Sequence, residues 1–226
     1  PNCNPRPQGA PIDLIVIHSI SLPPGEFDNG NVQRLFTNQL DWDAHPYFQG
    51  IRGLKVSSHF FISRTGKLWQ FVSCNDRAWH AGESAYRGRS QCNDDSIGIE
   101  LEGLEGNTFE SPQYDTLCSL CAALAQRYPI SHIAGHEHIA PGRKNDPGQG
   151  FDWVLLQNSL ALPDRYFPGA DKKKQRLWLF QSANFSTESA PLPFANPVSA
   201  GVCRQNPSAS RTRASPTFQK PYSVKV

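Results

Sequence analysis

Short runs of apolar residues along the first 135 positions predict the strands of a β-sheet. Residues 13–18, Asp-Leu-Ile-Val-Ile-His, have the pattern of a central strand that is covered on both faces. Two further runs, at 58–63 and 67–72, flank a Thr-Gly turn and predict a hairpin. A short strand is expected at 131–134, and a polar loop is expected at 135–150.

Residues 97–102 alternate strictly between apolar side chains and small or acidic ones. In a strand, this period puts the apolar members on one face and Gly98, Glu100 and Glu102 on the other. Such alternation is typical of a strand with one solvated face. Unless they serve a site, the two glutamates are therefore expected on an exposed side of the sheet.

A helix is predicted over 111–128, with Ser111 as its N-cap and Pro112 at its first position. Cys118 and Cys121 form a C-x-x-C pair, which suggests redox chemistry or zinc as alternatives to packing. Both thiols lie on the apolar stripe of the helix, and no second pair completes a zinc ribbon. We therefore expect reduced, buried cysteines. The stripe consists of Tyr114, Leu117, Cys118, Cys121, Leu124, Ala125 and Tyr128.

Strands that interleave with helices, including a short helix at 32–40, predict an α/β (α+β) sheet domain over residues 1–170. The hydrophobic share of 38% and the charged share of 19% fit a soluble globular chain. Residues 171–226 are rich in Ser, Pro and Ala without a sustained period, and predict an irregular, disordered extension. No apolar run approaches the roughly 18–20 residues of a membrane span.

The net charge of +2 conceals two regions of opposite sign. Residues 1–170 carry −5, whereas residues 171–226 carry +7. This division excludes a single basic patch over the whole protein. A basic tail is more often solvated than bound to nucleic acid, so we expect no nucleic-acid partner.

Candidate chemistry is concentrated in one strand end and one loop. His18 lies at the carboxyl end of its strand, where α/β folds place functional groups. With Asp146 and one of the loop histidines, His136 or His138, it would supply the three protein ligands of a catalytic zinc. Chemistry alone does not choose between the two loop histidines, which point the same way on an extended segment. Asp146 also has a simpler possible role, which is to cap backbone amides in its Asp-Pro-Gly turn.

Four segments occur in order along the chain: HSISLPPGEF (18–27), RAWHAG (77–82), CNDDSIGIELEG (92–103) and GHEHIAPGRKNDPG (135–148). Together they closely resemble the zinc-dependent N-acetylmuramoyl-L-alanine amidases. The nearest branch is the type that acts on anhydro-muropeptides in cell-wall recycling. The resemblance runs from about residue 4 to residue 153. It implies a central mixed β-sheet flanked by helices, the fold shared with peptidoglycan-recognition proteins.

The resemblance implies that His18, His136 and Asp146 hold Zn²⁺, because the family ligand directly follows the loop glycine. It also implies that Glu100 activates the attacking water and that Lys144 stabilises the oxyanion, roles that suit a carboxylate and an ammonium. The bond cut would join an N-acetylmuramoyl group, expected in its 1,6-anhydro form, to the amine of L-alanine.

The candidate substrate contacts are Ser19, Lys55, Trp79 and Arg143. Ser19 stands where close relatives often have Asn. Lys55 and Gln91 stand where they tend to carry Arg, whose bidentate fork suits stem-peptide carboxylates. Trp79 is equally suited to a core position, and Arg143 to a solvated loop.

Two other histidines, His59 and His80, are expected to be structural or to support the ligands rather than to bind metal. Two alternative functions remain open at this point. One is a recognition module that binds muropeptide without hydrolysing it, and the other is a lytic amidase that degrades intact peptidoglycan. We expect a monomer whose substrate is a small soluble muropeptide. We also expect a cytoplasmic location, with the periplasm left open because the chain begins at Pro1 without Met.

Overall fold

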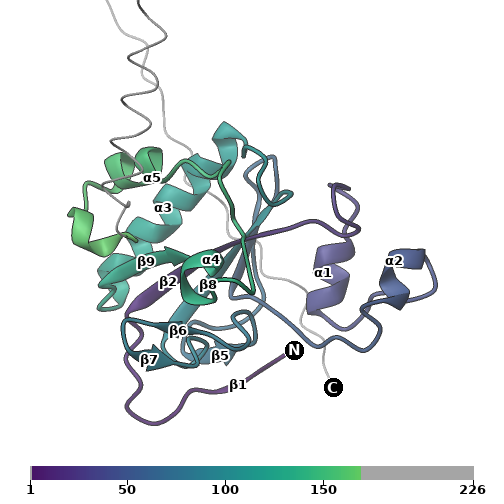
Figure 1. Ribbon diagram of the computed structural model, residues 1–226, viewed down its shortest axis with the longest axis horizontal. Coiled ribbons are helices and arrows are strands. Elements are labelled where there is room, and N and C mark those ends of the chain that lie inside the picture. The colour runs from purple at the N-terminus through teal and green to yellow at the C-terminus, as the bar shows by residue number, and fades with distance from the viewer. Residues whose placement is uncertain (1, 169–226) are drawn as a thin grey trace, which may run out of the picture. The chain divides into compact units, whose positions relative to one another are not determined.

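The computed structural model describes residues 2–168 (Figure 1). A five-stranded mixed sheet lies at the centre of this part, in the order β4-β3-β8-β2-β9. Its strands are β2 (Leu14–Ile20), β3 (Phe60–Ile62), β4 (Leu68–Gln70), β8 (Ser96–Glu102) and β9 (His132–Gly135). β2 pairs in parallel with β8 and β9, β3 pairs in parallel with β8, and β4 is antiparallel to β3. The predicted α/β (α+β) class and the hairpin are confirmed.

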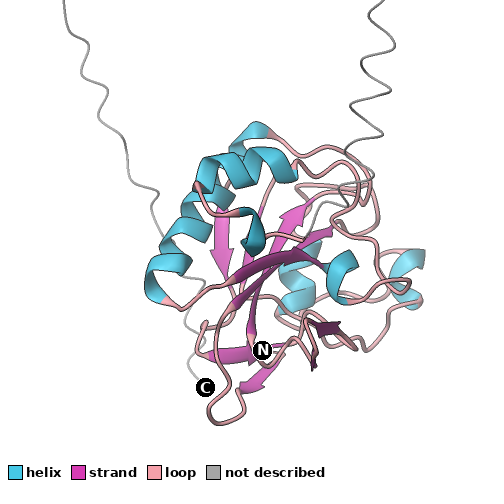
Figure 2. Cartoon of the chain, turned by 60° about the vertical axis from the view of Figure 1, so that its left-hand side comes forward, coloured by secondary structure: helices cyan, strands magenta, loops and turns pink. Residues whose placement is uncertain are grey.

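The remaining elements surround this sheet (Figures 1 and 2). The helices are α1 (Asn31–Phe36), α2 (Pro46–Gln49), α3 (Ser111–Arg127), α4 (His136–Ile139) and α5 (Trp153–Leu160), followed by a 3₁₀ turn at Asp164–Tyr166. Two small antiparallel ribbons pair β1 (Cys3–Pro5) with β5 (Asp76–Ala78) and β6 (Ala85–Tyr86) with β7 (Arg89–Ser90).

The central strand β2 is covered on both faces, as its unbroken apolar run predicts. Ile15 and Ile17 point into the main core together with residues of α3. Leu14 and Val16 point the opposite way, into a second cluster of buried side chains. All four are fully buried. Because side chains alternate along a strand, His18 lies on the same face as Leu14 and Val16.

The predicted alternation along β8 is confirmed, but the prediction that its two glutamates lie on an exposed face is wrong. Glu100 is 8% exposed and Glu102 is 4% exposed. Both Glu102 carboxylate oxygens accept backbone N–H groups, from Asp28 at 2.7 Å and from Arg64 at 3.2 Å. Glu102 therefore fastens two loops to the sheet. The register sets Glu100 directly opposite His18 on the neighbouring strand.

The long helix α3 occupies the predicted residues, with α5 packed beside it (Figure 1). Its N-cap is Glu110 rather than Ser111, and the backbone N–H of Glu110 donates to the Gln113 side chain at 3.0 Å. Cys121 is fully buried in the main core, with Cys118 partly buried against it. Both are free thiols, so the packing role predicted for this C-x-x-C pair is confirmed.

Two predicted segments differ from the structure. The short helix at 32–40 ends at Phe36, where the Thr37 hydroxyl bonds back to the carbonyl of Gln33 and Asn38 takes a positive φ of 58°. The expected polar loop at 135–150 begins instead with the single helical turn α4. A four-residue turn is too short for a periodic apolar stripe to reveal it in the sequence.

None of the helices within residues 2–168 is long and apolar enough to cross a membrane. The basic segment predicted as an irregular extension, residues 171–226, lies outside the described residues.

Candidate active site

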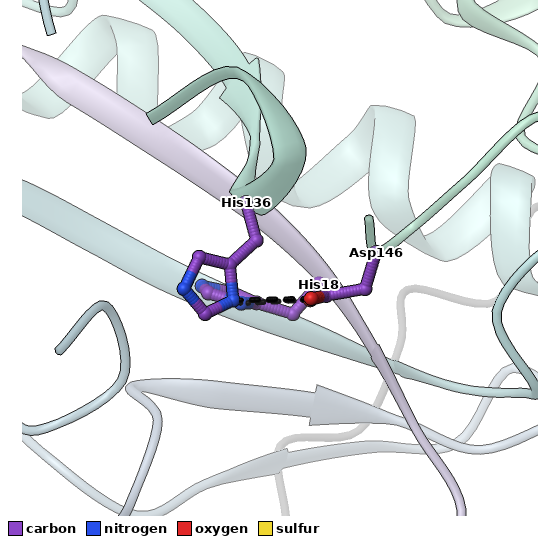
Figure 3. A group of neighbouring side chains, drawn as sticks. All are labelled: His18, His136 and Asp146. Carbon is purple, nitrogen blue, oxygen red and sulfur yellow. Dashed lines mark hydrogen bonds and ion pairs between the residues drawn. The ribbon is translucent and has the colours of Figure 1, made fainter. Parts of the chain in front are cut away.

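Three potential metal ligands meet at the carboxyl ends of β2 and β9 (Figure 3). His18 belongs to β2, His136 begins α4, and Asp146 comes from the loop that follows. The two Nδ1 atoms are 3.0 Å apart, and each lies 3.2 Å from Oδ2 of Asp146. All three residues are buried. Side chains that are 128 positions apart in the chain thus point their ligand atoms at one point.

Zinc fits this set of donors. Zinc binds imidazole nitrogen and carboxylate oxygen, and donors at about 2.0–2.1 Å in a tetrahedron are separated by about 3.4 Å. The observed separations of 3.0 and 3.2 Å are close to that value. The Nε2 of His136 lies 3.0 Å from the Ala81 carbonyl, which can only accept a hydrogen bond. The proton is therefore on Nε2, and Nδ1 presents its lone pair to the site.

The protonation states of these side chains also suit a metal. Burial lowers the pKa of His18 to about 4, so its imidazole is neutral at pH 7. Burial alone would raise the pKa of Asp146, but the adjacent imidazoles of His136 and His18 hold it well below its usual range. A neutral imidazole and an ionised carboxylate are the forms that coordinate a cation.

The turn α4 separates the two loop histidines that the sequence left equivalent. His136 is 3% exposed and faces the ligand cluster. The Nδ1 of His138 instead accepts the backbone N–H of Gly135 at 2.9 Å. A Cβ on Gly135 would lie 2.8 Å from Pro147 and 3.0 Å from the His138 ring. Only glycine therefore allows the loop to close tightly enough to bring Asp146 beside His136.

Glu100 lines the same cleft as the three ligands. Its Oε2 is buried and has no hydrogen-bond partner among residues 2–168. Burial, together with repulsion from Asp146, raises the pKa of Glu100 well above its usual value, and Lys144 opposes the rise. A buried carboxyl with an unused oxygen and a raised pKa is suited to taking up and releasing a proton.

Lys144 provides a positive charge on the same cleft. The segment that carries it turns sharply, because the backbone N–H groups of Arg143 and Lys144 both bond to the Ala140 carbonyl, at 3.1 and 3.0 Å. The side chain is exposed, yet its charge influences both Glu100 and His18. The structure therefore brings the predicted ligands, Glu100 and Lys144 to one place.

The cleft has a volume of about 230 Å³, and one wall is apolar. Tyr47 and Leu54 are 42% and 43% exposed on this wall, whereas most large apolar side chains within residues 2–168 are buried or half-buried. The sequence does not predict this wall, because its residues come from α1, α2 and two loops and share no periodic pattern. It consists of Leu22, Leu35, Phe36, Tyr47, Ile51, Leu54 and Val56.

The four candidate substrate contacts occupy different places. Ser19 lines the cleft with a buried hydroxyl that has no hydrogen-bond partner among the described residues. Lys55 is exposed between two residues of the apolar wall. Trp79 and Arg143 are not among the described residues that line the cleft. Trp79 donates its indole N–H to Asn4 at 2.6 Å. The Arg143 guanidinium donates to the carbonyl of Ala81 at 2.7 Å and to that of Glu83.

Comparison with known proteins agrees with this arrangement. The sequence profile of the family "N-acetylmuramoyl-L-alanine amidase" matches residues 8–149, a range that contains all three ligands, Glu100 and Lys144. The chain belongs to this family. Among curated amidases, the 1,6-anhydro-N-acetylmuramyl-L-alanine amidase AmpD of Citrobacter freundii is 49% identical over 168 residues, covering 74% of this chain and 89% of that protein. AmpD of Escherichia coli K12 is 47% identical over 159 residues, covering 70% and 87%.

Solved amidase structures share the fold. A crystal structure of a selenomethionine derivative of AmpD superposes with a TM-score of 0.69 at 48% identity, covering 71% of this chain and 90% of that one. The amidase AmiD of E. coli, in complex with anhydro-N-acetylmuramic acid-L-Ala-D-γ-Glu-L-Lys, has a TM-score of 0.53 at 31% identity and covers 68% and 60%. The predicted AmpD-type resemblance and the amidase fold are confirmed.

Proposed function

We propose that this amidase holds Zn²⁺ with His18, His136 and Asp146 and hydrolyses the amide bond between a 1,6-anhydro-N-acetylmuramoyl group and L-alanine. The observation that carries the proposal is the meeting of two imidazoles and a carboxylate in one cleft, beside a Glu100 oxygen that has no hydrogen-bond partner among the described residues. When bound, zinc supplies Lewis-acid chemistry that polarises the scissile carbonyl and acidifies water.

The protein's own side chains carry the proton and balance the charge. Glu100 takes a proton from the attacking water and later delivers it to the nitrogen of the departing L-alanine. Burial raises its pKa, which strengthens the carboxylate as a base for the proton of the attacking water. The ammonium of Lys144 offsets the negative charge that develops on the carbonyl oxygen of the tetrahedral intermediate.

The choice of substrate is supported by the relatives and by the shape of the cleft. Relatives at 45–49% identity carry the name 1,6-anhydro-N-acetylmuramyl-L-alanine amidase. A more distant structure, AmpDh3 of Pseudomonas aeruginosa, is in complex with an anhydromuramic pentapeptide. Beside the polar centre, the apolar wall with Tyr47 and Leu54 suits the methyl groups of the lactyl and alanyl units. Ser19 and Lys55, at and beside the cleft, are the proposed polar contacts to the peptide.

We also propose that the protein acts in the cytoplasm, as a monomer, on soluble muropeptides. The free thiols at Cys3, Cys74, Cys92, Cys118 and Cys121 are consistent with a reducing compartment.

The decisive experiment compares purified protein on soluble 1,6-anhydro-muropeptide and on intact sacculi. We expect stoichiometric zinc, release of free L-alanyl peptide from the soluble substrate, loss of activity with a chelator and recovery with zinc. Protein that binds the muropeptide without releasing peptide would instead be a recognition module. Hydrolysis of sacculi but not of the soluble substrate would identify a lytic amidase.

A further inference from the structure

The RAWHAG motif has no place in the proposed chemistry, yet its dipeptide His80-Ala81 contacts both metal-binding histidines. The His80 ring nitrogen Nδ1 lies 2.9 Å from Nε2 of His18. The Ala81 carbonyl lies 3.0 Å from Nε2 of His136. His80 is 9% exposed and Ala81 is fully buried. One short segment thus touches the far nitrogen of each imidazole.

The hydrogen-bond partners determine where the proton sits on each ring. The Ser96 hydroxyl donates its one proton to the Cys92 carbonyl. At 3.2 Å from Nε2 of His80, the same hydroxyl oxygen is therefore an acceptor, and the His80 proton is on Nε2. This leaves Nδ1 of His80 as an acceptor, so the Nε2–H of His18 donates to it.

The consequence is that His18 presents the lone pair of its Nδ1 to the site. The Ala81 carbonyl imposes the same tautomer on His136. Two lone pairs then face each other at 3.0 Å beside the Asp146 carboxylate. A cation relieves the repulsion that this arrangement would otherwise create.

Two further residues hold the dipeptide in place. The Asn93 side-chain oxygen accepts the backbone N–H of His80 at 3.1 Å and that of Ala81 at 2.8 Å. Asn93 is itself 6% exposed. On the other side, the His80 ring lies directly on Gly98 of β8, where a Cβ would be 2.5 Å from the ring. The position of His80 is therefore determined by hydrogen bonds as well as by packing.

We propose that His80 and the Ala81 carbonyl, clamped by Asn93, are positioning groups that set the tautomer and orientation of both metal-binding histidines. This inference rests on the proposed zinc site. A residue that hydrogen-bonds to a metal-ligating histidine can fix its tautomer. Removing such a residue typically weakens metal binding about 10–100-fold.

The test is a pair of variants at position 80, measured as zinc dissociation constants by chelator competition. In His80→Asn, an amide oxygen close to the position of Nδ1 still accepts from His18, whereas His80→Leu has no acceptor. We expect His80→Leu to weaken zinc binding about 10–100-fold and His80→Asn to restore most of the loss. The visible spectrum of the cobalt-substituted protein should shift in His80→Leu and resemble the wild type in His80→Asn.

A control separates this role from general stability. His59→Leu removes a neighbouring buried imidazole, whose Nδ1 accepts the Gly98 N–H and which forms no hydrogen bond with a proposed ligand within residues 2–168. It should lower the thermal midpoint of the zinc-free protein while leaving zinc affinity within about twofold, well below the typical loss. Unchanged affinity in His80→Leu, or equal losses in His80→Leu and His80→Asn, would overturn the inference. A wild-type protein that binds no zinc would instead overturn the zinc site itself.

Discussion

Replacing Glu100 by Gln should change turnover and stability in opposite directions. The substitution keeps the size of the side chain but removes its ability to exchange a proton. Loss of a general base typically lowers turnover about 10²–10⁴-fold, which corresponds to about 3–5 kcal/mol of transition-state stabilisation. Zinc should stay bound, because Glu100 is not one of the three converging ligands.

The stability gain follows from the surroundings of Glu100 in the zinc-free protein. Its Oε2 is buried without a hydrogen-bond partner within residues 2–168, and the charge repels Asp146. An unsatisfied buried polar group costs about 1–3 kcal/mol, and more when it is charged. The amide of Gln removes the charge and with it the repulsion from Asp146. We expect the thermal midpoint at pH 7 to rise by about 2–4 °C for each kcal/mol gained.

The assays are steady-state peptide release with zinc bound and thermal unfolding with zinc removed. Glu102→Gln is the matched control, because Glu102 lies two residues along the same strand and accepts hydrogen bonds from two backbone amides. It should destabilise the protein by about 1–3 kcal/mol while leaving turnover nearly unchanged. Normal turnover in Glu100→Gln would refute its role as the base, and a lower midpoint would refute the argument from the unpartnered oxygen.

Three other predictions address the metal, the core and the pH dependence. Asp146→Ala should lose zinc and activity together, and retained zinc with normal turnover would show that Asp146 is not a ligand. Leu117→Ala, at a fully buried position, should lower the free energy of unfolding by about 2–5 kcal/mol in denaturant titrations. Leu155→Ala, at a position that is 37% exposed, is the control and should change this free energy by less than about 0.5 kcal/mol. Burial raises the pKa of Asp95 to about 6, so its proton stabilises the fold at low pH. That stability is lost as pH rises from about 4 to about 6. Asp95→Asn should therefore show a flatter dependence of stability on pH between about 4 and about 6. The control is Asp115→Asn at an exposed position, which should keep the steep dependence. Equal steepness in the two variants would contradict the role of Asp95.

Much of the fold can be predicted from the sequence because its signals are local. The apolar run of β2 and the stripe of α3 each reflect burial of a face, which period and composition reveal directly. The burial of the α3 cysteines can be predicted for the same reason, because both lie on the apolar stripe of the helix. The resemblance of four ordered motifs identified the family and pointed to the same ligands that the structure brings together.

Only the tertiary structure decided which of several equivalent residues serve the site. Glu100 and Glu102 share one face of β8, but the register opposite His18 and the backbone amides of two loops give them different roles. The turn α4 separates His136 from His138 in the same way.

The support of the metal-binding histidines was equally hidden from the sequence. It depends on a backbone carbonyl at Ala81 and on a hydrogen bond between His18 and His80, which are 62 positions apart. A sequence records side-chain types and local period, whereas strand register, backbone partners and proton positions arise only when distant segments pack together. For this protein, the chemistry of the ligands was determined by the sequence, and their tautomers and roles were decided by the fold.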